Sequence, residues 1–197
     1  GFTGAAVISA NAAVKTGSGL VTLAVFHECL NMLSSCSPEV MTADLNDKNR
    51  LLDLLKKVNS IAFGPGLGNN PRTLELLKFV LENSDAPMVI DADGINVLAE
   101  EPALLEKLKN RCILTPHLGE FSRISGLSIE EISKDRIKAA KDFSKKYSDY
   151  LHSSIEPVLK EYPKMKIKIS SSRKSCSEGK KLRICYIKIF SMSSDEI

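Results

Sequence analysis

The stretch Ile61-Ala62-Phe63-Gly64-Pro65-Gly66-Leu67-Gly68-Asn69-Asn70-Pro71 decides the fold of this chain. Its first three residues are apolar and are typical of the end of a buried strand. Three glycines then allow a backbone turn that side chains would block, and Pro71 starts a helical pattern. The order of strand, glycine loop and helix N-terminus presents backbone N–H groups to an anion in α/β proteins.

The glycine loop by itself leaves two interpretations open. It matches neither the G-x-x-x-x-G-K-[ST] pattern of a P-loop nor the G-x-G-x-x-G pattern of a dinucleotide fingerprint. A tight turn before a helix would also explain the three glycines. Phosphate binding by the N–H groups of the loop is the functional alternative.

The composition narrows the class of protein. The chain has 197 residues, of which 43% are hydrophobic and 26% charged, as in an ordinary globular protein. A net charge of +3 is too small to indicate a nucleic-acid partner. No apolar run approaches the ~20 residues that span a bilayer, and the first residues lack the basic region of a signal peptide. We therefore expect a cytoplasmic protein without a nucleic-acid or membrane partner.

The five cysteines lack C-x-x-C spacing, which favours reduced thiols over a zinc site. We expect no metal site built from them.

Strands and helices alternate on both sides of the glycine loop. Apolar runs predict strands at 20–25, 38–41, 61–63, 87–91 and 112–114, and helical patterns cover 4–16, 48–58, 94–99, 102–108 and 128–147, with another beginning at residue 71. Alternation with short connections predicts an α/β fold with a mostly parallel sheet and helices on both faces. No strand precedes the first helix, which we interpret as an N-terminal truncation.

Polar residues follow the predicted strands where a parallel sheet binds its ligands. Asp91-Ala92-Asp93-Gly94-Ile95-Asn96 places two carboxylates and a carboxamide after one strand. Binding of a metal or of magnesium phosphate is the functional interpretation. The alternative is that Asp93 or Asn96 caps the next helix. We expect Asp91 to lie near a site.

A second polar group follows the strand at 112–114. Thr115-Pro116-His117-Leu118-Gly119-Glu120-Phe121-Ser122-Arg123 gathers His, Glu and Arg within one loop and helix start. His117 could hydrogen-bond or orient a substrate. Glu120 and Arg123 are three residues apart and could simply pair on one helix face.

The chain changes character after about residue 147. Only one of the eleven glycines, Gly179, lies beyond that point, and serine and lysine become frequent. We predict a domain at 1–148 and a divergent Ser/Lys-rich tail at 149–197, with one strand at 184–190. The tail has little apolar surface to offset the entropy of ordering, so we expect it to be the least ordered part.

Two pairs of motifs and one further stretch, in this order and spacing, point to one family. They are 1–6 with 15–22, 64–68 with 91–96, and the stretch 114–123. Together they resemble the ADP/ATP-dependent NAD(P)H-hydrate dehydratase family, also called the YjeF C-terminal or carbohydrate-kinase-related family. The resemblance covers residues 1–148. It implies a ribokinase-like three-layer α/β/α fold that is incomplete here, without the N-terminal strand and the C-terminal nucleotide-binding part.

The resemblance also implies an activity and a set of site residues. The family repairs nicotinamide nucleotides by dehydrating (6S)-NAD(P)HX to NAD(P)H. ADP or ATP, together with Mg, serves as the phosphoryl donor. The substrate-binding residues implied for this chain are Ala5, Gly68, His117, Leu118, Gly119, Glu120, Phe121, Ser122 and Arg123, with Gly64, Gly66, Asp91 and Asn96 close to the site.

The family's Gly-Gly-Thr-Gly-Asp loop, which carries its catalytic carboxylate and anion hole, has no counterpart in this sequence. The catalytic residue is therefore unassigned, and the chain could be inactive. A non-catalytic dinucleotide-binding module and a small-molecule kinase of ribokinase-like fold remain alternatives. A homo-oligomer is also open.

Overall fold

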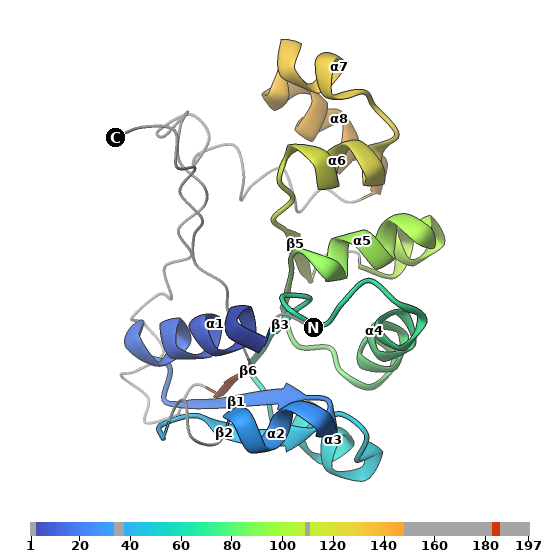
Figure 1. The fold of residues 1–197 in the computed structure, drawn as a ribbon. Coiled ribbons are helices and arrows are strands. Elements are labelled where there is room, and N and C mark those ends of the chain that lie inside the picture. The colour runs from blue at the N-terminus through green and yellow to red at the C-terminus, as the bar shows by residue number, and fades with distance from the viewer. Residues whose placement is uncertain (1–2, 34–37, 109–110, 148–182, 186–197) are drawn as a thin grey trace, which may run out of the picture.

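The computed structural model describes residues 3–33, 38–108, 111–147 and 183–185. A six-stranded sheet runs through the molecule, with helices packed along it (Figure 1). The strands are β1 (Leu20–Val25), β2 (Met41–Asp44), β3 (Ser60–Phe63), β4 (Met88–Ile90), β5 (Cys112–Leu114) and β6 (Arg183–Cys185). Their order in the sheet is β2-β1-β6-β3-β4-β5. Every described pair is parallel, which confirms the predicted sheet type.

The helices connect these strands in the order expected for an α/β protein. They are α1 (Thr3–Lys15), α2 (His27–Leu33), α3 (Lys48–Leu55), α4 (Pro71–Asn83), α5 (Asp93–Glu100), the 3-10 helix η1 (Pro102–Leu108), α6 (Leu118–Ser125), α7 (Ile129–Lys134) and α8 (Arg136–Tyr147). No helix in the described ranges has the length and apolar character needed to cross a membrane.

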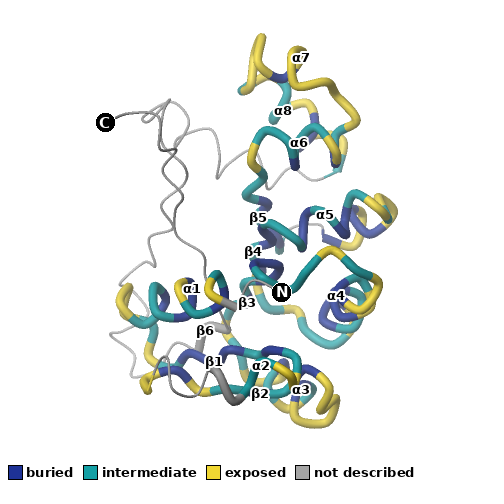
Figure 2. The backbone as a smooth tube through the Cα atoms, viewed as in Figure 1, coloured by how far each residue is buried: buried dark blue, intermediate teal, exposed yellow. Residues whose placement is uncertain are grey.

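Side chains that alternate along the strands contribute to two separate hydrophobic cores. The smaller core joins the alanines of α1 to the side chains of β1 that face it: Ala6, Ala10, Ala13, Val21, Leu23, Val25 and Val40 are its buried members. The larger core lies against the opposite side of β3, where Ile61 and Phe63 are buried, and takes in Leu77 of α4 and Leu98 of α5. Helices therefore cover both faces of the sheet (Figures 1 and 2).

Some predicted boundaries were wrong for local reasons. The predicted helix at 128–147 divides at Asp135, whose carboxylate accepts a hydrogen bond from the Lys138 N–H at 2.9 Å and so starts α8. The extended piece predicted at 38–41 is displaced, because β2 begins at Met41. Of the strand predicted at 184–190, the structure describes only β6. The other tail residues, and the order predicted for them, lie outside the described residues.

The parallel strands bring three polar loops to one edge of the sheet. Phe63 pairs with Ile90, and Ile90 pairs with Leu114, so the carboxyl ends of β3, β4 and β5 are in step. The loops that leave these ends carry the glycine stretch, the two aspartates and His117, as we predicted from the alternation of elements.

Candidate site at the carboxyl edge of the sheet

The glycine loop and the loop after β4 are in direct backbone contact. Asp91 N donates a hydrogen bond to Phe63 O at 3.0 Å. A Cβ atom on Gly64 would lie 1.8 Å from the backbone oxygen of Asp91. Gly64 also has a φ of +122°, a conformation that L side chains rarely adopt. Only glycine therefore fits where these two loops meet, which gives Gly64 a structural role at the base of the site.

The Gly68 N–H has a protein partner. It donates to Oδ2 of Asp93 at 2.8 Å, across 25 positions of sequence. The capping interpretation of Asp93 was wrong, since Ala92 is the N-cap of α5 and no side chain caps that helix. The Asp93 carboxylate instead binds the amide that the sequence offered to phosphate. Asp91, at the end of β4, is buried.

His117 begins helix α6 through a capping box. Its Nδ1 accepts hydrogen bonds from the N–H groups of Gly119 at 3.0 Å and Glu120 at 3.3 Å. Glu120 in turn accepts the His117 N–H at 2.8 Å, and its other oxygen lies 3.1 Å from His117 Nε2. These partners assign the proton of the neutral ring to Nε2. Both ring nitrogens are thus engaged within the protein.

Arg123 and Asn96 join α6 to α5. Nη1 of Arg123 donates to Oδ1 of Asn96. Arg123 thus takes a partner on another helix, whereas Glu120 pairs with His117, so the pairing of Glu120 with Arg123 that the sequence left open is not the arrangement found.

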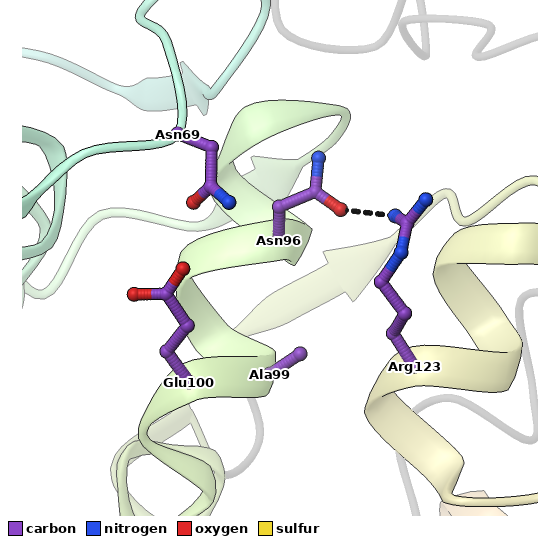
Figure 3. Close-up of a pocket in the computed structure, with 5 residues that line it drawn as sticks. All are labelled: Asn69, Asn96, Ala99, Glu100 and Arg123. Carbon is purple, nitrogen blue, oxygen red and sulfur yellow. Dashed lines mark hydrogen bonds between the residues drawn. The ribbon is translucent and has the colours of Figure 1, made fainter.

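A polar cleft of about 530 Å³ lies over this contact. Its lining residues are Asn69, Asn96, Ala99, Glu100 and Arg123. Figure 3 shows the Arg123 side chain reaching from α6 toward Asn96, with Asn69 and Glu100 farther along the cleft. The volume lies within the ~300–1,000 Å³ of ordinary ligand sites. The cleft presents one guanidinium, one carboxylate and two carboxamides to a ligand.

Several residues implied by the resemblance lie outside this cleft. The Ser122 hydroxyl donates to Leu127 O at 2.6 Å, and the Phe121 ring packs against Phe143 with centroids 5.4 Å apart. Ala5 is on α1, and its neighbour Ala6 lines a separate apolar cavity of about 100 Å³ beneath the Gly64–Leu67 loop. The structure brings Asn96 and Arg123 together, and it joins Gly68 to them through Asp93.

Sequence reasoning missed Asn69 and Glu100. Asn69 directly follows the last glycine of the loop, so it had to lie at the same sheet edge. Glu100 lies four residues after Asn96, a spacing that puts both on one helix face. That spacing was the available signal, but the face itself was set by packing against α6.

The described residues offer no metal centre, and their buried cysteine, Cys112, is not an activated thiol. No group of three or more His, Cys, Asp or Glu side chains among them could hold a metal ion. Burial raises the pKa of the Cys112 thiol to about 12, so this cysteine of β5 stays protonated and is a poor nucleophile. The Gly68 amide, for which the sequence left phosphate binding open, binds the Asp93 carboxylate instead.

Comparison with known proteins places most of the chain in one group. The family profile described as NAD(P)H-hydrate dehydratase matches residues 1–152. A bifunctional NAD(P)H-hydrate repair enzyme, Nnr, of Coxiella burnetii is 40% identical over 151 residues, which are 77% of this chain and 30% of that protein. This chain therefore spans only part of the length of its relative.

Solved structures agree on the architecture. A ribokinase-like superfamily protein of Enterococcus faecalis matches with a TM-score of 0.67 at 24% identity, over 74% of this chain and 51% of that one. The ADP/ATP-dependent NAD(P)H-hydrate dehydratase of Bacillus subtilis, co-crystallised with ATP/Mg²⁺ and soaked with CoA, matches with a TM-score of 0.57 at 25% identity. That match covers 73% of this chain and 52% of the other. The fold is therefore an incomplete ribokinase-like α/β arrangement.

Proposed function

The chain belongs to the NAD(P)H-hydrate dehydratase family, and on that premise we propose that its described part holds the dinucleotide substrate of a nicotinamide-repair reaction. The reaction is the ADP- or ATP-dependent dehydration of (6S)-NAD(P)HX to NAD(P)H. The observation that carries the proposal is the polar cleft between α5 and α6, where Arg123 and Asn96 meet. We place the protein in the cytoplasm, with a small molecule as its partner and a homo-oligomer as one possible assembly.

The chemistry of the cleft suits a phosphorylated ribose. The planar guanidinium of Arg123 can donate several hydrogen bonds to phosphate oxygens, and Asn96 holds one of its nitrogens in place. The Glu100 carboxylate can accept hydrogen bonds from ribose hydroxyls. Asn69 and Asn96 offer both donors and acceptors to the remaining polar atoms. We assign binding and orientation of the substrate to these side chains.

By the resemblance, turnover in this family uses a Gly-Gly-Thr-Gly-Asp loop that has no counterpart in this sequence. The described residues hold no cluster of three or more His, Cys, Asp or Glu side chains that could bind a metal ion, and the Gly68 amide already binds the Asp93 carboxylate. We therefore derive no step through the donor. This same observation favours a second candidate, a module that binds the dinucleotide without turning it over.

Binding and turnover can be measured separately on the full chain. Calorimetric titration with NADPH tests binding, and incubation with hydrated NADH plus ATP or ADP and Mg²⁺ tests for the return of reduced-nicotinamide absorbance. We expect binding, and Arg123→Ala should weaken it by about tenfold or more, since a hydrogen bond to a charged group contributes ~1.5–3 kcal/mol. Arg50→Ala removes an exposed guanidinium on α3 and serves as the matched control.

The two measurements have four distinct outcomes. Binding with turnover supports the dehydratase, and binding without turnover supports the non-catalytic module. Equal binding by Arg123→Ala and the unchanged chain would remove the cleft from the site. No binding of NADPH would overturn both candidates.

A further inference from the structure

We propose that Asp93 is a positioning residue for the substrate cleft. Its carboxylate fixes the end of the glycine loop and leaves anion recognition to Arg123. The inference deepens the proposed function and rests on it for the identity of the ligand. The hydrogen bond from Gly68 N to Asp93 Oδ2, at 2.8 Å, supports the inference and does not depend on which ligand binds.

The glycine loop needs an external contact to hold one conformation. Gly64, Gly66 and Gly68 all have positive φ values, of 122°, 77° and 84°. Such residues lose more backbone entropy on ordering than any others. Within the loop, Leu67 N donates to Gly64 O at 3.1 Å, and the Thr73 hydroxyl of α4 donates to Leu67 O at 3.3 Å.

These two bonds hold the loop up to Leu67, and Asn70, whose Oδ1 accepts the Thr73 N–H at 3.2 Å, caps α4 just after Asn69. The Gly68 peptide is held from the opposite side, by Asp93. Asn69, which lines the cleft, follows directly. The Asp93 contact and the Asn70 cap therefore hold the chain on the two sides of Asn69, and only the Asp93 contact comes from α5.

Asp93 is free for this contact because it does not cap its own helix. Ala92 is the N-cap of α5, with φ of 48° and ψ of −119° and no side-chain cap. Asp93 and Asn96 lie three residues apart at the start of α5, so they share one helix face. One turn of α5 thus holds the loop through Asp93 and orients Arg123 through Asn96.

The charges of Asp93 and Arg123 indicate that an anion binds on the Arg123 side of the cleft. A phosphate approaching the Gly68 amide would meet the Asp93 carboxylate already bound there, and like charges repel. Arg123 supplies positive charge with free guanidinium capacity, because one guanidinium offers five N–H donors. The phosphates of a dinucleotide should therefore contact Arg123, while the Gly68 amide stays with Asp93.

Nuclear magnetic resonance of the full chain tests the contact directly. The Gly68 amide in Asp93→Asn should keep its hydrogen-bonded shift, because the Asn oxygen can still accept. In Asp93→Ala the Gly68 and Asn69 amides should shift upfield and exchange faster with solvent. Asp53→Ala, which removes an exposed carboxylate from α3, should leave both amides unchanged. An unaltered Gly68 amide in Asp93→Ala would overturn the proposal, whatever the chain binds.

Titration with NADPH distinguishes a phosphate bound at Arg123 from one bound at the Gly68 amide. The two assignments predict changes of opposite sign in the affinity of Asp93→Ala for NADPH. If Asp93 positions the cleft, Asp93→Ala weakens NADPH binding by about tenfold, because the Gly68 N–H loses its acceptor and Asn69 is no longer held in the wall of the cleft. Asp93→Asn restores binding to within about twofold. If the Gly68 amide were the phosphate contact, removing the carboxylate would tighten binding, and this outcome would overturn the proposal. If neither the unchanged chain nor any variant binds NADPH, the proposed function fails, and the Gly68 amide alone decides the role of Asp93.

Discussion

Ala92 stores backbone strain beside the candidate site. Its φ of 48° makes it the one non-glycine residue in the described ranges with a positive φ, and such conformations cost about 1–3 kcal/mol. Ala92→Gly removes the Cβ that causes the strain, but it also loosens the unfolded chain by ~0.5–1 kcal/mol. We expect a net gain of about 1 kcal/mol in the free energy of unfolding, measured by urea denaturation.

The same substitution in a helix supplies the control for Ala92. Ala139 lies within α8, where Ala→Gly should lower stability by about 1 kcal/mol. Loss of stability in Ala92→Gly as well would show that the backbone at position 92 is not strained.

Cys112 should be chemically silent in the folded protein. It is buried on β5, and burial raises the pKa of its thiol to about 12. Since the thiolate is the reactive form, iodoacetamide at neutral pH should leave Cys112 unmodified and label the half-buried Cys29. Peptide mapping by mass spectrometry distinguishes the two sites. Both should react in guanidinium chloride, and rapid native labelling of Cys112 would contradict its burial.

At the residue scale the sequence predicted which edge of the sheet its polar loops share, but it missed Asn69 and Glu100 of the cleft and the partners of the side chains there. Asp91, Asn96 and His117 were predicted at one edge from their places after strands, and they lie there. The Asp93 contact with Gly68 spans 25 positions. It depends on how two strands pair, which no local pattern encodes.

At the scale of the element, helix α6 depends on its cap. His117→Ala removes the acceptor for two N–H groups, so we expect a loss of about 1 kcal/mol in the free energy of unfolding. Asparagine is a good N-cap residue, so His117→Asn should recover most of that loss. Thermal and urea denaturation measure both effects, and Ser128→Ala, at the cap of α7, should give a similar loss.

The same variants decide whether His117 also contacts the substrate. Because α6 carries Arg123, an unstable cap would weaken binding indirectly. If NADPH affinity returns with stability in His117→Asn, His117 acts through the helix. If affinity stays low while stability returns, the imidazole itself contacts the ligand.

Helices and strands were predictable where the spacing of apolar residues agreed with the residues that start or end an element. Strand β1 (Leu20–Val25) lies where its apolar run predicted it. Helix α4 begins at Pro71 as predicted, because its apolar spacing and its start at Asn70 and Pro71 both indicate a helix. The break at Asp135 was missed because charged residues continue the helical pattern through it. A single aspartate that caps a new helix looks the same in sequence as one on a solvated face.

At the scale of the molecule, alternation predicts a parallel sheet but not the order of its strands. The structure places β6, the last strand along the described part of the chain, between β1 and β3. Neighbouring strands in sequence need not be neighbours in the sheet, and hydrophobic pattern does not select among the possible orders.

The two cores should open at different free energies. The described core around α1 and β1 contains seven buried residues, three of them alanines, whereas the core beneath β3, β4 and β5 contains twenty-one. Alanine buries little apolar surface, so the first core gains less from burial. The two parts of the sheet are joined through β6, which pairs with β1 at only two described positions, Leu20 with Arg183 and Val21 with Ile184.

We therefore predict that β1 opens before β4. Native-state hydrogen exchange followed by mass spectrometry should show amides of Leu20–Val25 exchanging at least about tenfold faster than those of Met88–Ile90, a difference of ~1.4 kcal/mol in opening free energy. Enough guanidinium chloride to unfold the whole chain should abolish the difference, which controls for intrinsic exchange rates. Equal protection of the two strands in the native state would show that the sheet opens as one cooperative unit, with β6 joining its two parts as firmly as the longer ladders do.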